Sequence, residues 1–422
     1  MLQVLTSAWA LLLGMALLMV GNGMQGTLLG IRGEIEGFST LQMSIVMSAY
    51  FAGFLGGSQL APGMIRRVGH VRVFAALASL ISAVLILYPT FTEVWVWTLG
   101  RVLIGFCFSA VYVTAESWLN NAATNENRGQ ALSLYMIVQT AGIVLAQYLL
   151  LAADPSGFIL FVIPSVLVSV AVTPILLSIS PTPAFATTKA MSLRRLQRVS
   201  PLGCMGMFLL GGVFSAQFGM AAVYGGKVGL TVPQISTFVA SFFIGSVILQ
   251  YPIGWISDRM DRRQLIIIVS AIGAAGSVLG MMLGHYYGLL LVSAFVVGGM
   301  SNPLYSLLIA HTNDFLDLED MAAASGGMLF INGLGAISGP IITGYLMDMV
   351  GPGGFYLFTG LLFAWLVAYG AWRATRRRSV PAQEAGAYVA VSPSATAVTL
   401  GAVAEVWSEE AEQQAEQQNA AE

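Results

Sequence analysis

Long apolar runs separated by short polar connectors repeat along most of the chain. A helix needs about 20 apolar residues to cross a bilayer, and the alternating segments of a membrane barrel are not seen. The pattern predicts an all-α integral membrane protein. Its first run is expected to be a retained helix, because it lacks the preceding basic residue that a signal peptide carries. The twelve expected spans are about 6–28, 41–64, 71–90, 95–119, 129–151, 157–179, 202–224, 234–256, 265–284, 288–310, 322–347 and 354–373.

Composition supports the membrane class. Hydrophobic residues make up 57% of the chain and charged residues 9%, whereas soluble domains carry about 25% charged residues. Cys107 and Cys204 lie inside apolar runs and are expected to be small core residues. The histidines lack metal-ligand spacing, and no catalytic or nucleotide-binding signature appears. We therefore expect no enzyme activity, no metal, no cofactor and no nucleic-acid partner.

Basic residues predict the orientation and the domain boundaries. Of the 18 Lys and Arg, Arg32 and Lys227 fall on one side and Arg101 falls within a span, which leaves 15 on the other side. Basic connectors face the cytoplasm, so both termini are expected there. The expected units are a six-span bundle at 1–180, a basic cytoplasmic linker at 181–200, a second six-span bundle at 201–378, and an acidic, disordered cytoplasmic tail at 379–422.

The two bundles share an internal repeat. A shift of 192 residues superposes them, and it becomes 193 farther along the chain. Each half holds an even number of spans, so both enter from the same side and form parallel repeats about an axis along the membrane normal. The superposed positions include GFSTLQMS at 37–44 with GLTVPQIS at 229–236, Gly53 with Gly245, Gly105 with Gly298, and Tyr112 with Tyr305.

This architecture resembles the major facilitator superfamily, and several motifs carry the resemblance. GWISDRMDRR at 254–263 is similar to the family's signature loop, with Asp261 where a Gly is usual, and Arg66 replaces the aspartate in the first-half counterpart. The run RVLIG from Arg101 to Gly105 resembles the helix-4 arginine motif. The motifs AESWLN at 115–120, NRG at 127–129 and LYSLLIAHTND at 304–314 resemble the YcaD-like bacterial branch. The resemblance implies a monomer in the bacterial inner membrane.

Polar side chains inside apolar spans are costly, and they mark candidate solute or ion sites. The repeat matches Gln25 with Gln217 and Gln139 with Asn332, on helices that line the central cavity in the resembled fold. In that family the arginine matching Arg101 faces the same cavity. The alternative for these groups is helix–helix hydrogen bonding worth about 1 kcal/mol each. The cavity candidates are Asn22, Gln25, Arg101, Tyr112, Gln139, Gln217, Asn302, Tyr305 and Asn332.

Charged groups near the cytoplasmic side are gate candidates. Glu116 lies about 22 Å along the helix from Arg101 and cannot pair with it. A gating ion pair is expected for Glu116, and a proton-carrying role is the alternative. Its expected partners are Arg66, Arg67 and Arg128. The resemblance implies that Asp258 latches onto the N-terminal end of the eleventh helix. The arginines expected at the inner lipid headgroups are Arg259, Arg262 and Arg263.

Small residues on the fourth and eleventh spans are expected to allow close helix packing. They are Gly105, Gly335, Gly339 and Gly344. The spacing on the eleventh span resembles the family's antiporter motif, which normally belongs to the fifth helix. We predict a secondary active transporter that lies in the lipid bilayer and moves a small organic solute by alternating access. Transport is expected to be coupled to protons, and the sequence does not distinguish uptake from efflux. The alternatives are a drug–proton antiporter, a channel, a receptor that does not transport, or a membrane-embedded enzyme.

Overall fold

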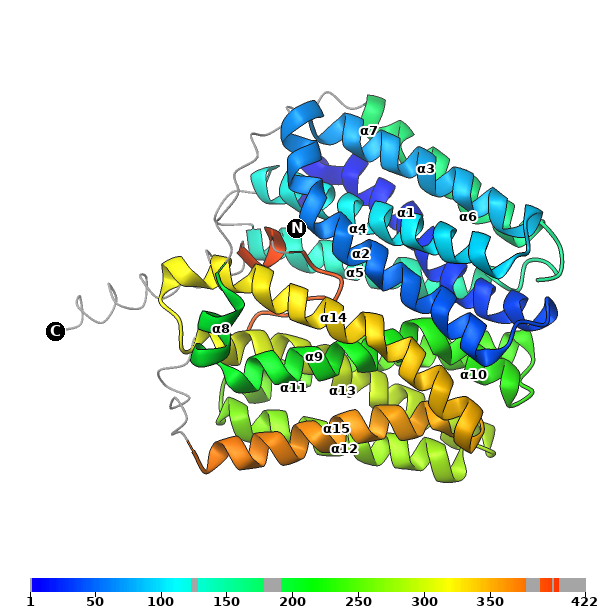
Figure 1. The fold of residues 1–422 in the computed structure, drawn as a ribbon. Coiled ribbons are helices and arrows are strands. Elements are labelled where there is room, and N and C mark those ends of the chain that lie inside the picture. Colours follow the sequence, from blue (N-terminus) through cyan, green and yellow to red (C-terminus); the bar gives the residue numbers. More distant parts are fainter. Residues whose placement is uncertain (1, 123–127, 178–190, 377–387, 397, 402–422) are drawn as a thin grey trace.

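The computed structural model describes residues 2–122, 128–177, 191–376, 388–396 and 398–401, and within these ranges it is helical without strands (Figure 1). The first half contains α1 (Leu2–Ile35), α2 (Thr40–Val68), α3 (His70–Thr90), α4 (Val94–Ala122), α5 (Arg128–Leu149), α6 (Ile159–Ala171) and α7 (Thr173–Leu177). The second half contains α8 (Leu193–Val199), α9 (Pro201–Ser215), η2 (Ala216–Met220), α10 (Ala221–Lys227), α11 (Val232–Ser257), α12 (Arg262–Leu283), α13 (Tyr287–Asn313), α14 (Leu318–Val350) and α15 (Gly354–Ala374).

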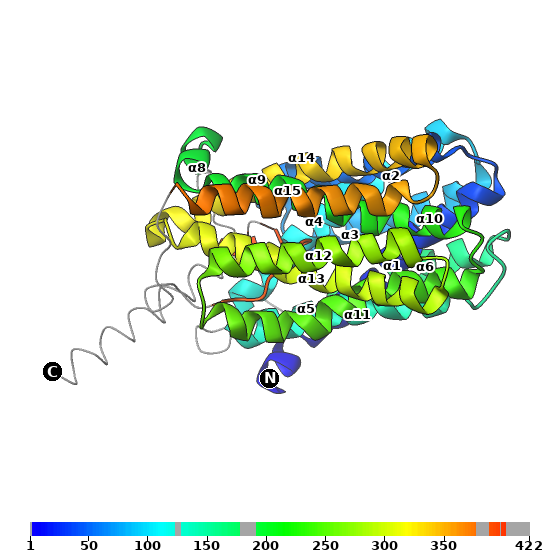
Figure 2. The ribbon, with the colours of Figure 1, turned by 90° about the horizontal axis from the view of Figure 1, so that it is seen from below.

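These helices form two bundles that lie side by side, the first half uppermost in Figure 1 and the second half below it. The interface brings α2 against α14 and α5 against α11, and the second of these pairs is seen from below in Figure 2. The predicted linker contributes α8 to the second half, where the Met191 amide donates to the Ala323 carbonyl at 2.9 Å. Residues 178–190 of the linker lie outside the described residues.

All twelve predicted spans correspond to helical rods among the described residues. Two rods are interrupted: Val172 separates α6 from α7, and the π-helical turn η2 joins α9 to α10. Eleven rods are long and apolar enough to cross a membrane. The twelfth is α2, whose hydropathy is lowered by several serines, Gln59 and a basic last turn. It packs between α4 and α14.

The repeat reappears in local backbone geometry. Gly37 and Gly229, which the repeat superposes, have φ angles of 77° and 76°, a region that favours glycine. In each case a capping box follows, formed by Ser39 with Gln42 before α2 and by a Thr–Gln pair before α11. A Ser or Thr at the N-cap and a Gln three residues later satisfy free amide groups at the helix start. Equivalent turns therefore begin equivalent helices in the two halves.

Each bundle contains a close crossing of two helices at a glycine, at positions that the repeat superposes. A Cβ atom added at Gly105 of α4 would lie 1.9 Å from the carbonyl oxygen of Tyr50 in α2. In the second half, a Cβ atom at Gly298 of α13 would lie 2.1 Å from the carbonyl oxygen of Phe242 in α11. The repeat superposes Tyr50 on Phe242 as it does the two glycines. Small residues let membrane helices approach closely and gain packing energy that lipid cannot supply.

The other predicted packing glycines also lie at close contacts. Gly335 of α14 lies against the backbone of α9, where an added Cβ would be 1.9 Å from the Phe208 carbonyl oxygen. At Gly339 an added Cβ would lie 2.0 Å from the hydroxyl oxygen of Ser215. Gly344 contacts α2 across the interface between the bundles. The last contact joins the two halves, whereas the first two stabilise the second half.

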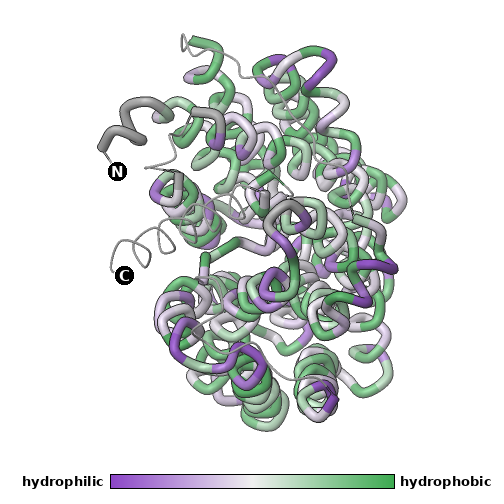
Figure 3. Tube along the Cα trace, turned by 90° about the vertical axis from the view of Figure 1, so that its left-hand side faces the viewer, coloured by the Kyte–Doolittle hydropathy of each residue, from purple (hydrophilic) through white to green (hydrophobic). Residues whose placement is uncertain are grey.

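The outer walls of the rods are apolar, as a bilayer requires. Large hydrophobic side chains such as Met282 and Trp95 are 70% and 66% exposed. Figure 3 looks onto one end of the molecule, where hydrophilic stretches of chain gather in the connections between helices. We call this the basic end, and its arginines are Arg66, Arg67, Arg72, Arg194, Arg195, Arg198, Arg259, Arg262, Arg263, Arg373 and Arg376. We call the opposite end the acidic end, and its carboxylates are Glu34, Glu36, Glu93, Asp154 and Asp348.

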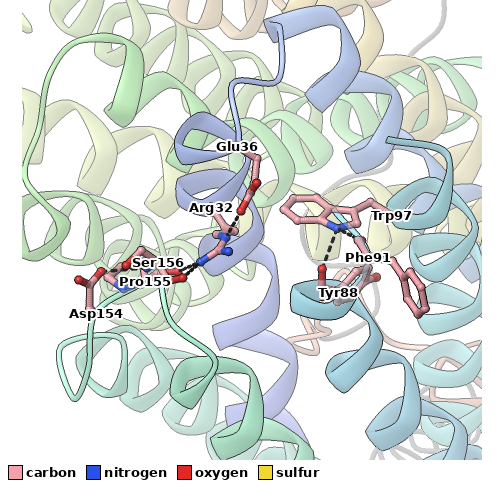
Figure 4. A network of polar contacts seen from close by, with 8 residues as sticks. All are labelled: Arg32, Glu36, Tyr88, Phe91, Trp97, Asp154, Pro155 and Ser156. Carbon is pink, nitrogen blue, oxygen red and sulfur yellow. Dashed lines mark hydrogen bonds and ion pairs between the residues drawn. The ribbon is translucent and has the colours of Figure 1, made fainter. Parts of the chain in front are cut away.

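Arg32 ties α1 to the α5–α6 connection at the acidic end (Figure 4). Its guanidinium donates to the Glu36 carboxylate at 2.6 Å and to the carbonyl oxygens of Pro155 and Ser156. The Ser156 amide donates to Asp154 at 2.9 Å, and this backbone hydrogen bond lowers the pKa of the Asp154 carboxyl. The basic residue at this end therefore organises a loop within the first half.

Substituting Gly105 tests the crossing. The Gly105→Ala side chain would overlap the α2 backbone, so we expect the variant to lose about 1–3 kcal/mol of unfolding free energy. Gly63→Ala is the matched control, because Gly63 lies on the same pair of helices with no atom within 4 Å of an added Cβ. Alanine is the better helix former, so this control should be neutral or stabilising. Thermal unfolding of both variants in detergent makes the measurement, and equal melting temperatures would contradict the packing argument.

Candidate functional site

A cavity of about 140 Å³ lies between the two bundles and takes its wall from both. Aromatic rings and carboxamides dominate the wall, and no charged side chain of the described residues lines it. The aromatic residues are Tyr50, Phe51, Phe54, Tyr112, Phe214, Phe218, Phe242 and Phe243. The carboxamides are Asn22, Gln139, Gln217, Asn302 and Asn332. Sites for drug-sized ligands hold about 300–1,000 Å³, so this cavity is narrow.

The first-half wall is a connected hydrogen-bond network. Asn22 of α1 donates to the Tyr112 hydroxyl of α4 at 2.8 Å. The side-chain oxygen of Asn22 (Oδ1) accepts from Gln25 at 3.2 Å and from the Tyr50 hydroxyl of α2 at 3.3 Å. Three helices are thereby joined through one amide. Such a network fixes the side chains that face the cavity, because moving any one of them would leave a buried polar atom without a hydrogen-bond partner.

Arg101 lies behind this wall and does not line the cavity. Its side chain is fully buried, and its Nη1 donates to the Gln25 carbonyl oxygen at 2.5 Å. The guanidinium carbon stands 4.6 Å from the centre of the Tyr50 ring, a distance at which a cation is attracted to an aromatic face. The Nε and Nη2 atoms are buried without a hydrogen-bond partner. Hydrogen bonds therefore connect the Arg101 guanidinium to Gln25, and Gln25 to Asn22 in the cavity wall.

The second-half wall is less fully bonded. Gln217 lies in the π-helical turn η2 and exchanges hydrogen bonds with the Ser301 hydroxyl at 3.3 Å. Asn332 donates to the Met207 carbonyl at 3.0 Å. The Asn302 carbonyl oxygen and the Tyr305 hydroxyl are buried without a partner. Tyr305 does not line the cavity, whereas the matched Tyr112 does. The pairs that the repeat matches are thus not used symmetrically.

The acidic end of the cavity is closed by direct contact between the halves. The Ser48 hydroxyl of α2 donates to the Ile337 carbonyl of α14. Gly30 of α1 lies against Ala222 of α10, where an added Cβ would be 2.7 Å from the alanine methyl. α1 also contacts η2 and α10 along this end. A solute in the cavity therefore has no open path past these helices.

The basic end is filled by a part of the C-terminal tail, which we expected to be disordered. Residues 388–396 and 398–401 lie between the halves, and Ser392, Pro393 and Ser394 belong to the cavity wall. The tail composition is acidic overall, but this stretch carries no charged residue. The rest of the tail lies outside the described residues. The tail's uncharged stretch can pack between apolar helices, which its charged remainder could do only at a high desolvation cost.

Glu116 contacts the tail segment. Its Oε2 accepts from the Thr396 amide at 2.9 Å and from the Thr396 hydroxyl at 2.5 Å, and its Oε1 accepts from Tyr135 at 3.5 Å. The carboxylate is fully buried. Arg66 and Arg67 are exposed at the basic end, and the Arg128 side chain lies outside the described residues. The gating ion pair of Glu116 remains a prediction.

The signature loop differs from its expected arrangement in two places. Arg262 and Arg263 are 4% and 6% exposed, so neither lies at the lipid headgroups as expected. Arg262 is buried because it forms an ion pair with the Asp314 carboxylate at the end of α13. Arg259 is exposed and stacks on Trp255, 4.0 Å from the ring centre. Asp258 accepts from the Tyr388 amide of the tail at 2.9 Å, and its latch onto α14 remains a prediction.

The aromatic residues of the cavity wall were not among those predicted from the sequence. Tyr50 and Phe51 of α2 superpose on Phe242 and Phe243 of α11 under the same shift of 192 residues, and all four line the cavity. An aromatic pair conserved between the two halves at one register was therefore a usable signal. Among the described residues, no group of three His, Cys, Asp or Glu side chains is placed to hold a metal ion.

Arg101 and Gln25 can be tested as one unit. Gln25→Leu removes the side chain that accepts from the guanidinium among the described residues, so we expect a loss of about 1.5–3 kcal/mol of unfolding free energy. The double variant Gln25→Leu with Arg101→Met replaces both partners by apolar groups, and it should lose less than the sum of the single variants. Melting curves of the three variants provide the comparison. Additive losses would show that the two side chains act independently.

Comparison with known proteins agrees with this architecture. The model of the Major Facilitator Superfamily matches residues 11–231 and again residues 203–409. An uncharacterized MFS-type transporter, YcaD of Escherichia fergusonii, is 26% identical over 343 residues, which cover 80% of this chain and 88% of that protein.

Two solved structures share the fold. The nucleoside transporter NupG matches with a TM-score of 0.74 and 15% identity over 86% of this chain and 98% of its own. The Escherichia coli fucose:proton symporter FucP matches with a TM-score of 0.56 and 16% identity over 86% of this chain and 98% of its own. With two six-helix bundles around one cavity and the family model matched in each half, the chain belongs to the Major Facilitator Superfamily of membrane transporters.

Proposed function

We propose that the protein is a secondary active transporter that moves a small, neutral, ring-bearing solute across the bacterial cytoplasmic membrane by alternating access. The observation that carries the proposal is the cavity between the bundles, which is lined by carboxamides and aromatic rings from both halves. A site shared by two rigid bundles can change the side to which it opens when one bundle rocks against the other. The basic end faces the cytoplasm in this proposal, in accord with the excess of arginine there.

The wall chemistry supports a neutral solute. A charged solute would need a compensating charge, and the described lining residues supply none. Aromatic faces favour flat or ring-bearing molecules, and the carboxamides offer both donors and acceptors for hydroxyl or amide groups. The Asn302 side-chain oxygen has no partner among the described residues and belongs to a residue of the wall, so we take it as the acceptor for a solute donor. Nucleosides combine a flat base with a hydroxylated sugar, and the neighbour NupG is named a nucleoside transporter.

Proton coupling is the second part of the proposal. Glu116 is a fully buried carboxylate at the basic end of the path between the halves. Ionisable residues inside a membrane span are costly, and in transporters they often serve as proton relays. Arg101 supplies a fixed positive charge behind the first-half wall, connected to the cavity through Gln25. The neighbour FucP is named a proton symporter.

Export of a hydrophobic drug-like compound in exchange for protons is the second candidate. The aromatic wall favours it, because eight rings would pack against an apolar solute as readily as against a nucleobase. One feature of the chain counts against it. The Gly–Pro pattern typical of antiporters lies on α14, the helix that packs against α2, rather than on α5.

Counterflow in proteoliposomes tests transport of a neutral solute. Vesicles preloaded with unlabelled uridine should accumulate external labelled uridine faster than empty vesicles. The reason is that a transporter with internal solute bound returns its site to the outside faster than one whose site is empty. Asn302→Ala should raise KM about fivefold through the loss of one hydrogen bond, and Gln264→Ala on the exposed surface of α12 serves as control. Absence of acceleration with uridine and with neutral sugars would contradict the proposal and favour a channel or a receptor.

Replacing Glu116 tests the coupling. Glu116→Gln keeps an acceptor for Thr396 but cannot carry a proton, so we expect counterflow to persist while accumulation driven by a pH gradient is lost. Counterflow uses vesicles preloaded with unlabelled uridine at equal pH on both sides, whereas the gradient assay uses empty vesicles of the same protein preparation in an outside buffer of different pH. Gradient-driven accumulation at the unsubstituted rate in this variant would exclude Glu116 as the proton carrier.

A further inference from the structure

Residues 388–396 and 398–401 lie between the two bundles at the basic end of the cavity, where Figure 1 shows them as the red segment. Val391, Ala395 and Leu400 are no more than 3% exposed. The segment is therefore enclosed by the helices on both sides and does not rest on the outer surface. Short peptides that bind in this way must offset their loss of freedom with specific contacts.

The second half supplies the first set of contacts. The Val391 amide donates to the Ser306 hydroxyl of α13 at 2.9 Å, and that hydroxyl donates back to the Val391 carbonyl at 3.2 Å. Gln250 of α11 donates to the Tyr388 hydroxyl at 2.8 Å, and the Tyr388 amide donates to Asp258 at 2.9 Å. Both backbone groups of Val391 are thereby paired.

The first half supplies the second set. Glu116 of α4 accepts from the amide and the hydroxyl of Thr396, and Thr399 lies near the same carboxylate. Ser394 donates to the Gln139 carbonyl oxygen at 3.4 Å. One short segment thus binds both bundles at once, and Glu116 accepts two of its hydrogen bonds.

The segment also occupies the route into the cavity. Ser392, Pro393 and Ser394 form part of the cavity wall. Tyr388 and Ala390 line a second, wider opening of about 850 Å³ between α5 and α11 at the same end. Among the described residues, the segment therefore lies on the basic-end side of the cavity, beside the opening between α5 and α11.

We propose that residues 388–396 and 398–401 form an autoinhibitory plug, which occupies the basic-end entrance of the cavity and must leave before solute can enter or depart on that side. This inference rests on the proposed transport function. Because the plug belongs to the same chain, its binding is intramolecular and competes with solute at a high effective concentration. Its contacts with both bundles also hold them at one separation, so the docked plug stabilises the conformation that is closed at the acidic end.

Cysteine labelling tests the plug without any solute. The reporter is Ser246→Cys in the cavity wall, placed in a full-length chain in which the two buried cysteines, Cys107 and Cys204, are replaced by alanine. The reagent is a water-soluble maleimide applied to purified protein. The docked plug should make labelling of the reporter slow.

Two substitutions in the plug should release it. Thr396→Asp places a second carboxylate against Glu116, and Val391→Asp places a charge at a position that is 1% exposed. Each should raise the labelling rate about tenfold, because Thr396→Asp sets two carboxylates against each other and Val391→Asp buries an unpaired charge. Thr375→Asp is the matched control, since Thr375 is exposed at the same end and bonds only its own helix. Its rate should stay within about twofold of the parent.

The outcomes separate this inference from the proposed function. Faster labelling in both plug variants with an unchanged control supports the plug, whether or not uridine is transported. Unchanged labelling in both plug variants overturns the plug even where uridine counterflow succeeds. In a chain that transports uridine, the plug variants should also raise the counterflow rate, and a lowered rate in correctly folded variants would overturn the inhibitory role.

Discussion

Polar side chains within a bilayer must be bonded inside the protein, and the arrangement of this molecule follows from where that can happen. Lipid offers no hydrogen-bond partner, so Asn22 of α1 bonds Tyr50 of α2 and Tyr112 of α4, which joins three helices of the first half. Four further carboxamides line the cavity where the two bundles face each other: Gln139, Gln217, Asn302 and Asn332. The interface between the halves is therefore both the place where polar groups are retained and the place where a solute can be bound.

The glycine crossings make each half a firm unit. Backbone contact between α2 and α4, and between α11 and α13, leaves no side chain between the helices that could repack. Contacts between the halves are of another kind, with small residues near the acidic end and the tail segment at the basic end. A molecule with firm halves and a separable interface can move at that interface, and its helices need not deform.

Much of the fold was predictable from the sequence because its signals are local or repeated. Apolar run lengths predicted the twelve rods, and the shift of 192 residues superposed Gly37 on Gly229, where the structure has equivalent turns. Six of the nine cavity candidates line the cavity, because a polar residue in an apolar span has few other places to lie. The three exceptions are Gln25, Arg101 and Tyr305, whose side chains are directed away from the cavity by packing that no single-sequence pattern encodes.

Other features depended on contacts between distant segments. The π-helical turn that holds Gln217 has no sequence signature. Arg262 is buried because Asp314, 52 residues away, forms an ion pair with it. The composition of the tail predicted disorder, whereas its uncharged stretch beginning at Tyr388 binds residues as distant as Glu116. Pairings of this kind are set by the three-dimensional structure rather than by periodicity.

The central claim is that two firm bundles rock about the cavity between them, and distances between spin labels test it most directly. One label pair, at Gln42 and Tyr345, spans the halves at the acidic end, and a second pair, at Val68 and Gln264, spans them at the basic end. Addition of a transported solute should lengthen one distance as the other shortens. Distances that stay fixed at both ends, or that lengthen together, would contradict the account.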